Sequence, residues 1–323
     1  MAEDDPGATS QALLQRLEWT VIRRLDGLLQ GEHRTWWRGA GLDLVDLREY
    51  QHADDVRHID WNVTARLNQA YVRQFTEDRE HTAWFLVDCS ASLDFGSNRR
   101  TKREVAREFV GVLARLLTRH GNRVGAMLYG TRVDTVLSPG RGRLHVLNLM
   151  ERLGSRPAIG PQGVTDLGEL LRSAQRSVRR RATLFVLSDY FSAPGWGAAL
   201  GQLAARHDVT AVRLIDPLER ELPDLGWVTM RDAESGEDLW VDTHDPGLRA
   251  RFRAAAQRRE SGLRAGFAGA GVDVLELSTD EDLFEAIVRF SDLRKQRSRL
   301  SGGSPAGAAR PWHDHLQGGT ASA

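Results

Sequence analysis

The sequence predicts an α/β fold with a doubly wound, mostly parallel sheet and one antiparallel edge strand, preceded by an N-terminal helical and extended segment. Two observations predict this fold. From residue 83 to about residue 295, short apolar runs alternate with stretches of helical periodicity. The apolar runs lack the alternation of a half-exposed strand, which is typical of parallel strands that are covered on both faces.

The first 80 residues show a different pattern and form the predicted N-terminal segment. Residues 1–9 are acidic and polar, which predicts disorder, and from Ser10 to about Leu29 apolar residues recur at helical spacing. Residues 42–50 and 71–75 each predict a short strand. We therefore divide the chain into this segment at 1–80, an α/β domain at 81–297, and a disordered tail at 298–323 that is rich in Gly, Ser, Ala and Pro.

Within the domain, strands and helices are expected in alternation. Buried strands are predicted at 83–87, 182–187, 209–214 and 272–277, and helices at 102–119, 143–153, 166–179, 196–206, 247–268 and 280–295. Segments 123–129 and 132–137 flank Gly130-Thr131, a two-residue connection that predicts a hairpin and hence the antiparallel edge. A second hairpin is predicted from 227–230 and 239–241.

Composition excludes several classes of function. The 44 basic residues match the 44 acidic residues, so the overall charge does not favour nucleic acid or an anionic membrane as a partner. Only Lys102 and Lys295 are lysines, which favours coding bias over phosphate binding.

The single cysteine, Cys89, rules out an intramolecular disulfide, and we expect it to be a small core residue. With no signal peptide and no apolar run of about 20 residues, the chain is expected to be cytoplasmic without a membrane span.

The candidate site begins where the first buried run ends in Asp88-x-Ser90-x-Ser92. Open α/β sheets bind ligands at the carboxyl ends of their strands. Thr165 at the start of a predicted helix and Asp189 at the end of a predicted strand add two more oxygen side chains. Each piece alone is explained by a turn, an N-cap or a loop residue. Together, the five oxygen side chains from three loops predict a site for Mg²⁺ or Mn²⁺.

This arrangement resembles a known family of domains. Over about residues 80–290, the Asp88-x-Ser90-x-Ser92 pattern with the later Thr165 and Asp189 resembles the metal-ion-dependent adhesion site of von Willebrand factor A domains. Four short upstream motifs resemble the bacterial domain-of-unknown-function family 58. They are Leu47-Arg48-Glu49-Tyr50, Asp54-Asp55-Val56-Arg57, Ile59-Asp60-Trp61 and Ala65-Arg66. The resemblance implies a von Willebrand A-like fold and an association with MoxR-type AAA+ ATPases.

The leading hypothesis is therefore a non-enzymatic protein-binding module. The metal site would capture a Glu or Asp from a partner protein, and the chain would work as an adaptor with a MoxR-type AAA+ ATPase in protein assembly or remodelling. The alternative is a Mg²⁺-dependent phosphatase of the haloacid-dehalogenase type with Asp88 as nucleophile. That chemistry needs a second Asp two residues further on as acid and base, where this chain has Ser90. The absence of a Gly-x-Ser-x-Gly elbow disfavours a serine hydrolase.

A second polar cluster precedes the domain and is built from His52, Asp54, Asp55, His58 and Asp60. These residue types could bind a second metal ion. A hydrogen-bonded structural corner is the interpretation that we favour.

Overall fold

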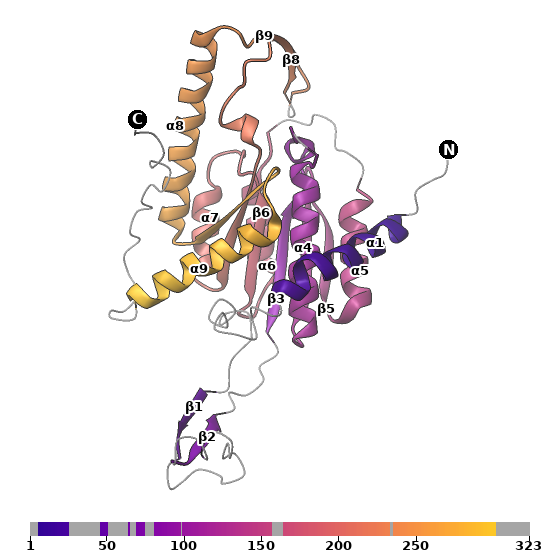
Figure 1. Cartoon of the computed structure of the whole chain (residues 1–323), viewed down its shortest axis with the longest axis vertical. Coiled ribbons are helices and arrows are strands. Elements are labelled where there is room, and N and C mark those ends of the chain that lie inside the picture. The colour runs from indigo at the N-terminus through magenta and orange to yellow at the C-terminus, as the bar shows by residue number, and fades with distance from the viewer. Residues whose placement is uncertain are drawn as a thin grey trace, which may run out of the picture.

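The computed structural model describes residues 6–25, 46–50, 64, 69–74, 81–97, 99–156, 164–232 and 235–301. Its centre is a six-stranded sheet with the order β10-β7-β6-β3-β4-β5 (Figure 1). The pairs β10–β7, β7–β6, β6–β3 and β3–β4 are parallel, and β5 pairs antiparallel with β4. The predicted α/β class, with a mostly parallel sheet and one antiparallel edge strand, is therefore confirmed.

The strands are β1 (Asp46–Glu49), β2 (Tyr71–Gln74), β3 (Thr82–Asp88), β4 (Arg123–Tyr129), β5 (Val133–Gly140), β6 (Thr183–Ser188), β7 (Asp208–Ile215), β8 (Trp227–Arg231), β9 (Asp238–Asp242) and β10 (Asp273–Ser278). The helices are α1 (Pro6–Leu17), α4 (Lys102–Arg119), α5 (Gly142–Gly154), α6 (Leu167–Ser177), α7 (Trp196–Ala204), α8 (Pro246–Ala270) and α9 (Leu283–Ser301). Three short helical turns are η1 (Glu18–Ile22), η4 (Ala91–Asp94) and η5 (Pro217–Glu219). Every helix and strand predicted between residues 83 and 295 has a counterpart here.

The N-terminal predictions can be compared only in part. Helix α1 and the π-type turn η1 cover most of the predicted helix, and β1 and β2 form a small antiparallel ribbon at the predicted strands. Residues 26–29 and 42–45 lie outside the described residues, and so does the cluster between His52 and Asp60.

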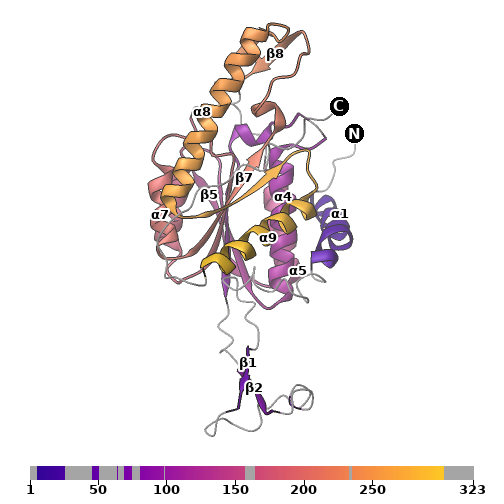
Figure 2. The ribbon, with the colours of Figure 1, turned by 60° about the vertical axis from the view of Figure 1, so that its left-hand side comes forward.

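The pleat of β3 divides the core between the two faces of the sheet. Phe85 and Val87 belong to the core beneath α1, α4, α5 and α9, whereas Trp84 and Leu86 belong to the core beneath α6, α7 and α8 (Figure 2). On the first face, Phe85 stacks on Phe185 with ring centroids 5.5 Å apart. Because β3 is covered on both faces, its side chains show the continuous apolar pattern seen in the sequence.

Helix α4 begins where the sequence predicts because Thr101 and Glu104 cap its N-terminus reciprocally. The hydroxyl of Thr101 accepts a hydrogen bond from the amide of Glu104, and the Glu104 carboxylate accepts one from the amide of Thr101 at 2.8 Å. This reciprocal capping satisfies amides that an uncapped helix would leave without partners. The cap fixes the position of Lys102, the first residue of the helix.

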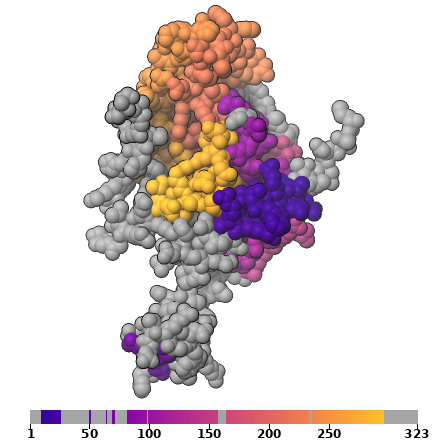
Figure 3. All heavy atoms as spheres, viewed as in Figure 1, coloured from indigo at the N-terminus to yellow at the C-terminus, as the bar shows by residue number. Residues whose placement is uncertain are grey.

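The N-terminal helix belongs to the core of the domain. Its buried side chains are Leu14, Leu17, Val21, Ile22 and Leu25. The guanidinium of Arg24 stacks over the ring of Phe284 in α9 at 3.6 Å, and Figure 3 shows the indigo N-terminal helix against the yellow C-terminal helix. Residues near both ends of the described chain therefore cover the same face of the sheet. Among the helices of the described ranges, none combines the length and apolar content that a membrane span needs.

Candidate functional site

The two carboxylates of the candidate site lie at the switch point of the sheet. The chain leaves β3 towards β4 on one side, and β6 pairs with β3 on the other side. Such a reversal leaves a crevice at the carboxyl ends of the two strands. Asp88 is the last residue of β3 and Asp189 directly follows β6, and each is only 1% exposed. The structure therefore brings both predicted carboxylates to one edge of the sheet.

The loop after β3 gathers three of the predicted ligands. One carboxylate oxygen of Asp88 accepts a hydrogen bond from the amide of Ser90 at 2.9 Å, and the other accepts one from the hydroxyl of Ser188 at 2.7 Å. The hydroxyl oxygens of Ser90 and Ser92 lie 3.3 Å apart. Both serines are buried. The turn thus holds one carboxylate and two hydroxyls within a small volume.

The environment of Asp88 opposes its negative charge. Burial, followed by the charge of Asp189, raises the pKa of Asp88 from 3.8 to about 6, although the hydrogen bonds from Ser188 and Ser90 lower it. Two buried carboxylates close enough to repel each other are unfavourable unless a cation joins them.

The fourth predicted ligand, Thr165, is hydrogen-bonded to the segment that follows Asp189. The carbonyl oxygen of Thr165 accepts hydrogen bonds from the hydroxyl of Ser192 at 2.9 Å and from the amide of Ala193 at 2.8 Å. Thr165 is buried, and α6 begins two residues later, at Leu167. The structure therefore fastens the Thr165 loop to the loop that carries Asp189.

The chain turns sharply after Asp189 at a residue with an unusual backbone conformation. Tyr190 has a φ of 63°, in the left-handed region that residues other than glycine seldom adopt. Its hydroxyl donates to the carbonyl of Val186 at 2.9 Å, and its ring packs edge-on against Phe267 with centroids 4.7 Å apart. These contacts hold a strained turn directly beside the site, and such strain is common at functional positions.

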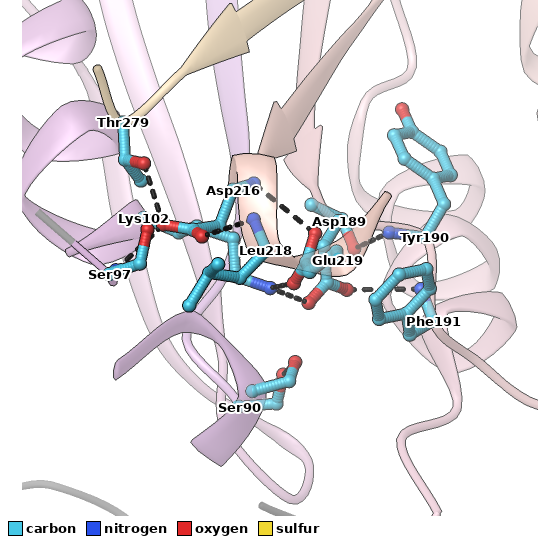
Figure 4. Close-up of polar contacts among 12 residues, drawn as sticks. Ser90, Ser97, Lys102, Asp189, Tyr190, Phe191, Asp216, Leu218, Glu219 and Thr279 are labelled. Atoms are coloured by element: carbon cyan, nitrogen blue, oxygen red, sulfur yellow. Dashed lines mark hydrogen bonds and ion pairs between the residues drawn. The ribbon is translucent and has the colours of Figure 1, made fainter. Parts of the chain in front are cut away.

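Two further charged residues belong to the site, and the sequence reasoning missed both. The ammonium of Lys102 lies 2.6 Å from a carboxylate oxygen of Asp189 and 2.5 Å from one of Glu219, which comes from η5 (Figure 4). Lys102 is only 1% exposed. Burial alone would lower the pKa of Lys102, but the charges of Asp189 and Glu219 outweigh it and the pKa is raised. The only signal in the sequence was the rarity of lysine among the basic residues.

A third buried carboxylate, Asp216, fixes the loop that presents Glu219. It accepts hydrogen bonds from the amide of Ser97 at 2.8 Å, the hydroxyl of Thr279 at 2.7 Å and the amide of Leu218 at 2.9 Å (Figure 4). These donors follow β3, β10 and β7, so Asp216 ties three strand ends together. The backbone amide of Asp216 also donates to Glu219.

The donor set fits a small divalent cation. Carboxylate and hydroxyl oxygens are hard ligands of the kind that Mg²⁺ and Mn²⁺ prefer. Within the described ranges, no three His, Cys, Asp or Glu side chains form a metal-binding group, and the predicted ligand set consists of two carboxylates and three hydroxyls. Lys102 balances only one of the three neighbouring carboxylates, Asp88, Asp189 and Glu219. This excess of negative charge favours a bound cation.

Cys89 lies between two of the predicted ligands but belongs to the core. Its side chain is 2% exposed within the apolar cluster that includes Phe85 and Phe109, as expected for a small core residue. Burial raises the pKa of the Cys89 thiol to about 12. The thiol is therefore not a candidate ligand or nucleophile.

The sequence of the chain matches a protein family and mycobacterial relatives. Residues 46–262 match the family described as "Protein of unknown function DUF58". The chain is 38% identical over 300 residues to the uncharacterized protein Rv1480 of Mycobacterium tuberculosis and to the uncharacterized protein Mb1516 of Mycobacterium bovis. In each case the match covers 93% of this chain and 93% of the relative.

Solved structures show weaker likeness. The conserved hypothetical protein BatB from Bacteroides thetaiotaomicron is 16% identical, with a TM-score of 0.42 over 68% of this chain and 99% of that chain. The PilB minor pilin from Streptococcus sanguinis is 13% identical, with a TM-score of 0.39 over 73% of this chain and 66% of that chain. At these values the likeness says nothing further about this molecule.

Proposed function

The chain belongs to the DUF58 family, whose description assigns no function, and we propose that it is a protein-binding module that uses a divalent cation to capture a partner's Glu or Asp. The cation is Mg²⁺ or Mn²⁺. In this proposal the ligands are Asp88, Ser90, Ser92, Thr165 and Asp189, in the manner of the metal-ion-dependent adhesion site of von Willebrand factor A domains.

One observation carries the proposal: Asp88 and Asp189 are buried at adjacent strand ends, and burial together with the charge of Asp189 raises the pKa of Asp88. When bound, the cation supplies positive charge beyond that of Lys102, which pairs with Asp189 alone of these two, and a coordination position for a partner's carboxylate. The residues of the chain prepare this position. Ser188 and the amide of Ser90 orient the carboxylate of Asp88, and the buried hydroxyls of Ser90 and Ser92 lie side by side.

We further propose that the partner is a MoxR-type AAA+ ATPase and that the chain serves it as a cytoplasmic adaptor in protein assembly or remodelling. The resemblance of the upstream motifs to family 58 supports this choice. In this arrangement the chain carries no catalytic residue of its own.

The test compares the full-length wild type with a Ser90→Ala/Ser92→Ala double variant. Ser261→Ala is the matched control, because Ser261 is exposed on α8 and its hydroxyl donates only to the carbonyl of Gln257. Binding of Mn²⁺ is measured by isothermal titration calorimetry. Capture of the purified MoxR-type ATPase from the same host is measured by pull-down in Mg²⁺ and in EDTA.

We expect saturable metal binding and Mg²⁺-dependent capture by the wild type and the control, and loss of both in the double variant. Equal capture in EDTA would contradict the proposal. Turnover of an aryl phosphate by the wild type that Asp88→Asn abolishes would instead support the phosphatase alternative.

A further inference from the structure

The buried ammonium of Lys102 suggests how the charge of the proposed metal site is set. We propose that Lys102 restrains the affinity of this site for the divalent cation and strengthens the capture of a carboxylate by the loaded site. The inference rests on the proposed function and names a residue that sets the strength of its two binding steps.

The charges around the site carry the argument. Asp88, Asp189 and Glu219 are three buried or mostly buried carboxylates, and Lys102 is the cation paired with two of them. With all four ionised, the group has two negative charges in excess, which one divalent cation balances. A loaded site that is neutral opposes an incoming carboxylate much less than a site that remains negative.

Removal of Lys102 therefore has two opposite effects. A divalent cation gains affinity because Asp189 and Glu219 lose their ammonium partner and the excess of negative charge grows. A partner's carboxylate loses affinity because the loaded site then keeps a negative charge. A residue with only a structural role would weaken both steps when it is replaced.

The geometry explains why a lysine suits this position in a chain whose other basic residues are nearly all arginines. The ammonium is a compact charge that donates to two carboxylates from different elements, Asp189 after β6 and Glu219 in η5. The planar guanidinium of an arginine is larger and directs its donors in a fixed fork. Lys102 itself is held in place by the capped start of α4.

A substitution of Glu219 changes the charge of the site in the opposite direction to Lys102→Met and serves as the matched variant. Glu219→Gln keeps the shape of the side chain and removes one negative charge next to the ammonium of Lys102. This variant should bind the divalent cation more weakly and, once loaded, bind a carboxylate more strongly. A Lys102→Met/Glu219→Gln double variant restores the wild-type charge and should resemble the wild type in both measurements.

The experiment uses the full-length protein and Mn²⁺ as the probe. Calorimetry gives the affinity for Mn²⁺, and the water-proton relaxation rate of the loaded protein falls when acetate replaces water on the ion. For Lys102→Met we expect binding of Mn²⁺ at least about tenfold tighter and binding of acetate at least about tenfold weaker. Circular dichroism confirms that each variant folds, and if Lys102→Met does not, Glu219→Gln and the double variant decide the question.

The outcomes separate this inference from the proposed function. If the wild type binds Mn²⁺ but Lys102→Met binds both Mn²⁺ and acetate more weakly, the inference is overturned while the metal site stands. If the wild type does not bind Mn²⁺ but Lys102→Met does, the proposed function fails and so does the capture that Lys102 would strengthen, while its restraint of metal affinity is supported. If no variant binds Mn²⁺, both are overturned.

Discussion

Replacement of Asp88 with asparagine should stabilise the metal-free protein at pH 7.5. In the folded protein the pKa of Asp88 is raised from 3.8 to about 6, mainly by burial and then by the charge of Asp189. Between these two values the folded state holds a proton that the unfolded chain has released. Stability is therefore lost as the pH rises through about 6 and Asp88 ionises.

The magnitude follows from the same difference in pKa. At about 1.4 kcal/mol for each pH unit, ionisation of Asp88 costs the folded state about 3 kcal/mol at pH 7.5. The asparagine side chain carries no charge, and its amide group can still accept from the amide of Ser90 and donate to the hydroxyl of Ser188. Asp88→Asn should therefore recover most of this free energy in the absence of metal.

The assay is urea unfolding in EDTA at several pH values from 4.5 to 7.5, followed by tryptophan fluorescence. The difference in unfolding free energy between Asp88→Asn and the wild type isolates Asp88 from the other ionisable groups. It should be about 3 kcal/mol at pH 7.5 and shrink to about 1 kcal/mol at pH 4.5. A variant that is no more stable than the wild type at pH 7.5, or a difference that does not change with pH, would refute the reasoning.

Three other perturbations test the packing around the site. Asp216→Ala should lower the unfolding free energy by about 3 kcal/mol in urea unfolding, because the amide of Ser97 and the hydroxyl of Thr279 lose a buried charged acceptor; an unchanged midpoint would contradict this. The Cys89 thiol, with its pKa raised to about 12, should resist an aromatic disulfide reagent in the native protein and react in urea, and rapid native labelling would show that the site loop opens. Deletion of residues 1–25 should cost at least about 4 kcal/mol by urea unfolding, since several buried leucines leave the core, and full stability of the shortened chain would contradict their packing.

The regular elements could be predicted because each follows from local chemistry. The continuous apolar run of residues 83–87 predicted a strand that is covered on both faces, and helix α4 begins at the predicted residue, where Thr101 and Glu104 cap it. The turn at Gly130-Thr131 likewise predicted the antiparallel edge between β4 and β5. These signals lie within a few residues of the element that they specify.

The candidate site could be predicted only in part. Asp88 and Asp189 were found because each ends an apolar run, and parallel strands bring such ends together. Lys102 and Glu219 were missed because they are 117 residues apart and their pairing depends on how η5 folds back over α4. Polar residues at the start of a helix are usually exposed, so nothing local to Lys102 indicates that it is buried.

The burial of the apolar side chains between Leu14 and Leu25 in the core changes how the segment from residue 26 to residue 80 relates to the domain. Ile22 and Leu25 before it are core residues, and so is Ala83 after it, so this segment is an insertion with two anchors on one body. The second anchor is β3, which runs about 20 Å from Thr82 to Asp88 at about 3.3 Å per residue. A partner that pulls on the insertion therefore acts at once on the N-terminal helix and on the strand that carries the first carboxylate of the candidate site.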